Sequence, residues 1–72
     1  MLITQQVSLG ALPPLEYARR ARGLTQRELE GLAGLPPTTI SHIEARRRKP
    51  DAATQLRIAR VLDVEEEALF PW

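Results

Sequence analysis

The chain has 72 residues and a formal net charge of +1, which leaves room for one small domain, and a helical bundle with short connections is the economical way to build it. The sequence contains no cysteine, which excludes disulfides and thiolate metal sites and fits a reducing cytoplasm. It has no run of about 18 apolar residues and no cationic start followed by an apolar block, so we expect a cytoplasmic protein without a membrane span or secretion signal.

Residues 1–12 are interpreted as an amino-terminal extension of a domain over residues 13–72. The extension has no charged side chain, which excludes a basic arm. Its apolar residues leave two alternatives: an extended strand that pairs across a dimer or covers the domain, or a frayed terminus. The candidate dimer contacts at the two ends of the chain are Leu2, Ile3, Val7, Phe70 and Trp72.

A first helix is predicted to begin near Pro14, because a double proline suits a helix entrance, and to end at Gly23. Leu15 and Ala18 form its apolar stripe. Arg19 lies about 40° from Leu15 on a helical wheel, so its stem points inward and its charge needs a partner.

A second helix is predicted to begin at Gln26, since Thr25 and Glu28 have the spacing of a capping box. Gly34 can end this helix in a left-handed conformation. Glu30 lies about 40° from Gln26 on the wheel, near the packed side, where it would need an arginine partner. The apolar face consists of Leu29, Leu32 and Ala33.

A third helix is predicted over residues 37–45, because the backbone angle of Pro37 suits a first helical position. Ile40 and Ile43 lie on one side of it. The opposite side carries Thr38, Ser41, His42 and Ala45. Four consecutive cations follow at residues 46–49, the first of them at a helix exit where a left-handed conformation costs about 1 kcal/mol.

Two further helices are predicted after this cationic run. Asp51 caps the fourth helix, and Asp63 takes the left-handed exit that glycine usually occupies. Three glutamates at residues 65–67 begin the fifth helix, where negative charge is favourable, and Leu69 and Phe70 close the core. The apolar residues of the fourth helix are Leu56, Ile58, Ala59 and Leu62.

The small net charge conceals an uneven distribution along the chain. Residues 19–49 contain eight cations and three anions, a net charge of +5, whereas residues 50–72 contain two cations and five anions, a net charge of −3. Such a particle presents one basic face to phosphates. The alternative is that residues 46–49 form an ordinary solvated charge run.

The segment from Thr25 to Lys49 resembles the helix-turn-helix of the lambda-repressor-like family of Cro and cI type. The resemblance extends over residues 15–70 and rests on Leu24-Thr25-Gln26, Leu29, Gly34, Thr39-Ile40-Ser41, Ile43-Glu44 and the basic run that closes at Pro50. It implies an all-α, five-helix DNA-binding domain with the helix-turn-helix at its second and third helices. It also implies an ion pair between Arg19 and Glu44.

The resemblance implies a regulator of transcription, a repressor that binds a short palindrome in double-stranded DNA as a homodimer, without cofactor or metal, in a bacterial cell or encoded by a phage. Gln26 would contact a phosphate, with Arg27 beside it. Thr38, Ser41 and His42 would read bases, while Pro37, in a place where the family has a polar residue, leaves only an apolar contact. The remaining candidate DNA contacts are Arg46, Arg47, Arg48 and Lys49.

Two other classes of function remain as alternatives. The apolar extension and Trp72 fit a protein-interaction module, an antitoxin or antirepressor-like partner on the same scaffold. An enzyme is disfavoured, because the sequence shows no carboxylate pair, nucleophile–base set or phosphate-binding glycine loop. Thr38, Ser41 and His42 could also be ordinary residues of a solvated helix face.

Overall fold

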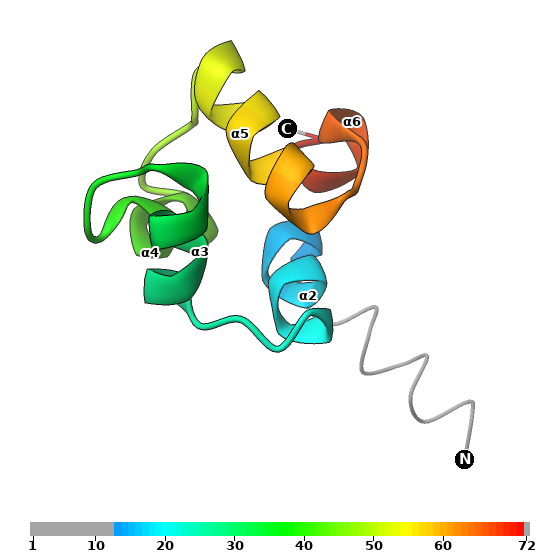
Figure 1. The fold of residues 1–72 in the computed structure, drawn as a ribbon. Coiled ribbons are helices and arrows are strands. Elements are labelled where there is room, and N and C mark those ends of the chain that lie inside the picture. Colours follow the sequence, from blue (N-terminus) through cyan, green and yellow to red (C-terminus); the bar gives the residue numbers. More distant parts are fainter. Residues whose placement is uncertain (1–12, 72) are drawn as a thin grey trace.

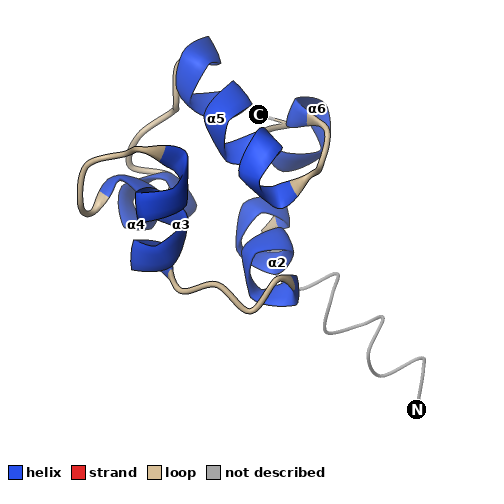
Figure 2. Ribbon diagram, viewed as in Figure 1, coloured by secondary structure: helices blue, strands red, loops and turns tan. Residues whose placement is uncertain are grey.

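The computed structural model describes residues 13–71, and five helices connected by short loops make up this part of the chain (Figure 1). They are α2 (Pro14–Ala21), α3 (Gln26–Ala33), α4 (Thr39–Glu44), α5 (Ala52–Leu62) and α6 (Glu66–Leu69). No strand occurs within residues 13–71, so the predicted all-α class with five helices is confirmed (Figure 2). None of these helices is long and apolar enough to cross a membrane. The predictions for residues 1–12 and for Trp72 lie outside the described residues.

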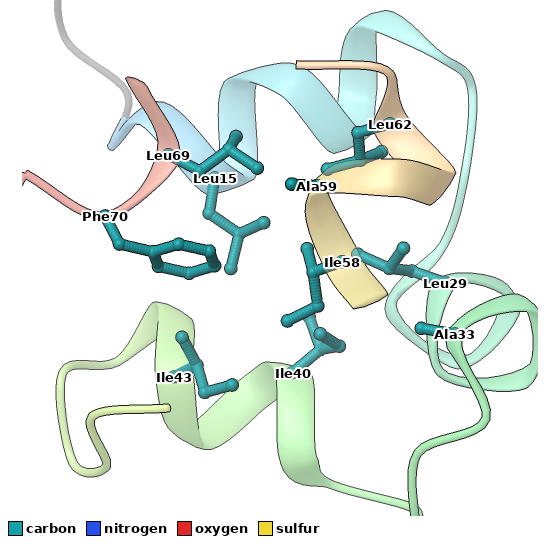
Figure 3. Close-up of a cluster of buried hydrophobic side chains, with 10 residues drawn as sticks. All are labelled: Leu15, Leu29, Ala33, Ile40, Ile43, Ile58, Ala59, Leu62, Leu69 and Phe70. Carbon is teal, nitrogen blue, oxygen red and sulfur yellow. The ribbon is translucent and has the colours of Figure 1, made fainter. Parts of the chain in front are cut away.

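One hydrophobic core joins all five helices (Figure 3). Leu15 of α2 and Leu69 of α6 lie on one side of this core, and Ile58 of α5 lies between them and α4. The side chains that are completely enclosed are Leu29, Ile40, Ile43, Ile58, Leu62 and Leu69. Because both α3 and α4 contribute to this cluster, their relative orientation is held by the same packing that stabilises the domain.

The helix ends follow from local chemistry. The Thr25 hydroxyl accepts from the Glu28 amide at 3.0 Å and the Glu28 carboxylate accepts from the Thr25 amide at 2.8 Å, so the predicted capping box is present. Gly34 ends α3 with φ of 69°, and Asp63 ends α5 with φ of 56°. Asp51 caps α5 by accepting from the Thr54 amide at 2.8 Å.

Two apolar residues that we expected to face the core do not. Leu32 is 63% exposed and Leu56 is 38% exposed. Leu32 lies about 200° around α3 from the buried Glu30, and Leu56 lies about 200° around α5 from the buried Ile58. The buried face of each helix is therefore centred on another residue, which turns the leucine away.

The third predicted helix begins two residues later than expected, at Thr39 instead of Pro37. A helix that started at Pro37 would need Thr38 in the right-handed helical conformation, and Thr38 is left-handed. Instead, the Thr39 amide donates to the Pro36 carbonyl at 3.4 Å, and Thr38 has φ of 66° and ψ of −2°. Proline followed by a residue with positive φ is the pattern of a type II turn.

Candidate nucleic-acid interface

Helix α4 exposes one side, on which the predicted base-contacting side chains lie. Its buried residues are Thr39, Ile40 and Ile43, which leaves His42 exposed and Ser41 half-buried. Thr38 is also exposed, but it lies in the turn before α4 and not within the helix. The three candidates Thr38, Ser41 and His42 are therefore grouped at the start and middle of this short helix.

The carbonyl of Thr38 accepts two hydrogen bonds from α4. The Ser41 hydroxyl donates to it at 2.9 Å and the His42 amide donates at 3.1 Å. Since the single hydroxyl hydrogen of Ser41 is used in this way, its oxygen is left as an acceptor. In the major groove, Ser41 is then suited to accept from the amino group of adenine or cytosine.

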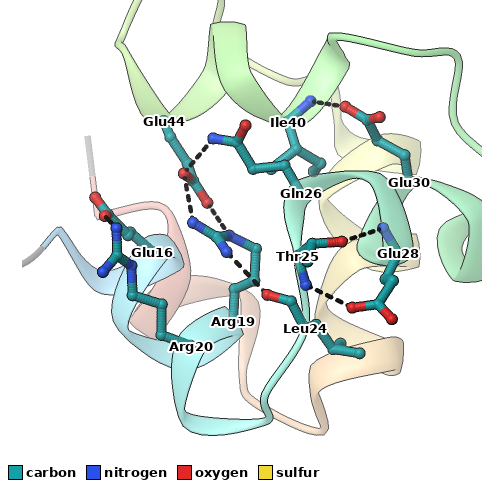
Figure 4. Close-up of polar contacts among 10 residues, drawn as sticks. All are labelled: Glu16, Arg19, Arg20, Leu24, Thr25, Gln26, Glu28, Glu30, Ile40 and Glu44. Atoms are coloured by element: carbon teal, nitrogen blue, oxygen red, sulfur yellow. Dashed lines mark hydrogen bonds and ion pairs between the residues drawn. The ribbon is translucent and has the colours of Figure 1, made fainter.

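A largely buried polar cluster joins α2, α3 and α4 (Figure 4). Arg19 Nε donates to Glu44 Oε2 at 2.7 Å and Nη2 donates to Oε1 at 3.1 Å, so the ion pair is bidentate. Arg19 Nη1 also donates to the carbonyl of Leu24 at 2.8 Å. The two charged side chains are only 8% and 6% exposed.

Arg19 stays charged in this cluster, because its hydrogen bonds with the Glu44 carboxylate raise its pKa above the ordinary value despite the opposing effect of burial. Gln26 Nε2 donates to Glu44 Oε1 at 2.9 Å. The glutamine amide, the predicted phosphate contact, is thus anchored by Glu44 and retains one N–H for another acceptor.

A shallow groove on the surface lies over this cluster, between α2, α3 and α4. It is lined by Glu16, Arg19, Arg20, Thr25, Gln26, Ser41, Glu44 and Ala45. Gln26 at the start of α3 and Ser41 on α4 are therefore brought to one depression, although they are far apart in the sequence. Arg20 at its edge pairs with Glu16 at 2.7 Å.

Glu30 was expected to need an arginine, and the structure gives it a different partner. It is 5% exposed, and its Oε2 accepts a hydrogen bond from the backbone amide of Ile40 at 2.9 Å (Figure 4). From the sequence we could infer that a buried Glu30 carboxylate would need a hydrogen-bond donor. We could not infer that the donor is a backbone amide, because the amide of Ile40 becomes available only when α4 begins at Thr39.

The candidate cations lie on α3 and in the loop after α4. Arg27 on α3 is exposed, as are all four cations of residues 46–49 in the loop after α4. Arg46 has φ of 61°, the left-handed conformation expected at this exit. Pro37 is exposed in the turn before α4.

Phe70, which we predicted as a dimer contact, packs in the core, so its ring is not available to a partner chain.

Within residues 13–71, no group of three or more His, Cys, Asp or Glu side chains is arranged to hold a metal ion.

A protein-family model described as helix-turn-helix fits residues 15–69 of the chain. No curated protein and no solved structure gives a significant match to the chain.

Proposed function

We propose that this chain, which belongs to the lambda-repressor-like, Cro/cI-type helix-turn-helix family of DNA-binding transcription regulators, is a repressor that binds a short palindromic operator as a homodimer. With α4 in the major groove, the protein would block a promoter by occupying it. It would act in the cytoplasm, on bacterial or phage DNA.

The observation that carries the proposal is the composition of the surface around α4. Thr38, Ser41 and His42 lie on it, and all have side chains that can hydrogen-bond to base edges. The exposed cations of residues 46–49 flank the same helix and would neutralise phosphates. The Arg19–Glu44 pair holds α4 against α2, so the surface is pre-organised.

Selection of bound duplexes from a randomised pool at moderate salt tests this function. We expect a palindrome whose half-sites lie about one helical turn, roughly 34 Å, apart. A single unpaired half-site would refute the dimer while retaining sequence-specific binding. Recovery of no motif would refute sequence-specific regulation by this chain alone.

A protein-interaction module on the same scaffold is the second candidate, and the exposure of Leu32 favours it. Leu32 is a large apolar residue, 63% exposed on α3, and no DNA contact needs it. Salt separates the two functions, because phosphate contacts make binding weaken steeply with salt and an apolar interface does not. A partner complex that withstands high salt and is disrupted by Leu32→Ser would support the second candidate.

A further inference from the structure

Glu30 connects the two sides of the turn between α3 and α4. Its backbone carbonyl accepts from the Leu35 amide at 2.9 Å, where α3 ends. Its carboxylate accepts from the Ile40 amide at 2.9 Å, where α4 begins. Glu30 thus forms hydrogen bonds both at the end of α3 and at the start of α4.

Helix α4 needs such a contact because its own sequence provides no cap. The first amides of a helix have no partner within the helix, and a Ser, Thr, Asp or Asn at the preceding position usually accepts from one of them. Here that position is Thr38, whose φ of 66° is left-handed and whose side chain makes no capping bond. The two prolines before it offer no side-chain acceptor.

The Glu30 carboxylate fills this place from a neighbouring helix. Ile40 is the second residue of α4, and an amide at this position is one that a capping side chain normally satisfies. The hydrogen bond is buried, so water cannot replace it without entering the core. No buried side-chain oxygen or nitrogen within residues 13–71 lacks a partner, which includes this carboxylate.

We propose that Glu30 helps to position α4 for sequence-specific contact with DNA by capping it from α3, in addition to the Arg19–Glu44 pair and the core packing. This inference rests on the proposed function, because its consequence is the discrimination between DNA sequences. Glu30 itself touches no DNA: it is buried, and it acts through the orientation of Ser41 and His42 on the helix that it caps.

The test compares Glu30→Gln with Glu30→Met in the full chain. Both variants remove the same charge and are close in size, but only glutamine retains an oxygen that can accept from the Ile40 amide. Amide hydrogen exchange of Ile40 is measured by NMR against that of Leu29 on α3, whose amide donates to the backbone carbonyl of the N-cap residue Thr25. The ratio of affinities for the selected duplex and for a scrambled duplex is measured at one salt concentration.

We expect the glutamine variant to retain the protection of Ile40 and the affinity ratio. In the methionine variant, Ile40 should exchange about 5-fold faster relative to Leu29, as expected for one lost hydrogen bond. The affinity ratio should fall by a similar factor, about 5-fold, while binding to the scrambled duplex stays within about 2-fold. A residue needed only for stability would weaken both duplexes alike.

Unchanged Ile40 protection in the methionine variant would overturn the proposal, and so would an unchanged affinity ratio. If the parent protein preferred no sequence at all, the proposed function would fail, and with it the part of the inference that concerns DNA. In that case Ile40 exchange still decides whether Glu30 caps α4, because this measurement needs no DNA.

Discussion

Arg19 is a buried cation with three hydrogen-bond acceptors around it, two on Glu44 and one at the carbonyl of Leu24. Removal of Glu44 would leave the buried guanidinium without its hydrogen-bonded counter-charge, and only the weaker electrostatic effect of Glu16 would remain. We expect Glu44→Ala to lower the free energy of unfolding by about 3 kcal/mol, the usual cost of breaking a buried pair. Urea denaturation of the parent and the variant measures this difference.

The double variant Arg19→Met, Glu44→Leu distinguishes two quantities: the cost of leaving one charge of the ion pair without its partner, and the net contribution of the intact pair to stability. Replacing both charges with apolar residues of similar volume is often neutral or stabilising, so we expect this variant to unfold within about 1 kcal/mol of the parent. The orientation of Gln26, which donates to Glu44 Oε1, should nevertheless be lost. A double variant as unstable as Glu44→Ala would contradict this account of the pair.

Asp51 makes the stability of α5 dependent on pH. The Thr54 amide donates to its carboxylate and lowers its pKa below the ordinary 3.8. A carboxyl group with a lowered pKa in the folded state stabilises the protein above its unfolded pKa, and this stabilisation disappears as the pH falls through the folded pKa. Its contribution is therefore fully present at neutral pH and is lost progressively as the pH falls below 3.8 toward the lowered pKa of the folded state.

Asp51→Asn retains an oxygen that can accept from the Thr54 amide but does not titrate. We expect the melting temperature of the parent, relative to that of this variant, to decrease as the pH falls from about 5 to below 3.8, the ordinary pKa of the carboxyl group. Thermal melts of both proteins at several pH values measure this difference in melting temperature. Taking the difference removes the pH dependence that all other titrating groups contribute equally to both proteins. A difference that stays constant over this range would exclude the proposed pH dependence.

Among the helices, α3 was predictable and the start of α4 was not. The start of α3 is encoded by neighbouring residues, Thr25 and Glu28, and its end by Gly34, so local chemistry is sufficient. Helix α4 has its cap on another helix, at Glu30, which only the folded chain brings into contact with it. Its predicted start at Pro37 was wrong because residues 36–39 form a turn in which Thr38 is left-handed.

The turn before α4 stores a conformational cost at Thr38. A β-branched residue with φ of 66° is unfavourable, whereas glycine adopts this conformation readily. We expect Thr38→Gly to raise the free energy of unfolding by about 1 kcal/mol. The same variant lacks a side chain for base contact, so its sequence preference should relax at one position of each half-site.

Denaturation and a repeated duplex selection measure these two effects on the same protein. Thr38→Ala is the matched control, because it removes the hydroxyl but retains the strained backbone. It should relax the sequence preference without the gain in stability. A stability gain of equal size in both variants would show that the backbone conformation of Thr38 is not the cause.

Over the whole molecule, the sequence predicts charge better than it predicts contacts. The net charge of +5 over residues 19–49 follows from counting, and the exposure of residues 46–49 agrees with it. Spacing on a helical wheel indicates only that Arg19 points inward, and its pairing with Glu44, which the structure shows, was predicted from the family resemblance. The contact of Gln26 with Glu44 depends on the helices meeting and was not predicted. The engagement of the Ser41 hydroxyl with Thr38 had no sequence signal.

The uneven distribution of charge between residues 19–49 and residues 50–72 predicts how salt affects DNA binding. Each cation that neutralises a phosphate contributes roughly 0.9 to the slope of log affinity against log salt concentration. Arg47 lies exposed in the loop after α4, whereas Arg60 lies on α5 in a groove that it shares with Asp63, Glu65 and Glu66. Replacement of either arginine changes the net charge by the same amount, so the pair forms a matched comparison.

We expect Arg47→Ala to weaken binding to all duplexes nearly equally and to reduce the salt slope by about one. Arg60→Ala should leave the slope within about 0.3 of the parent value, because its surroundings are acidic and repel phosphates. Fluorescence anisotropy titrations at four salt concentrations measure both slopes. Equal losses for the two variants would mean that net charge alone attracts DNA, and the surface around α4 would then have no privileged role in binding.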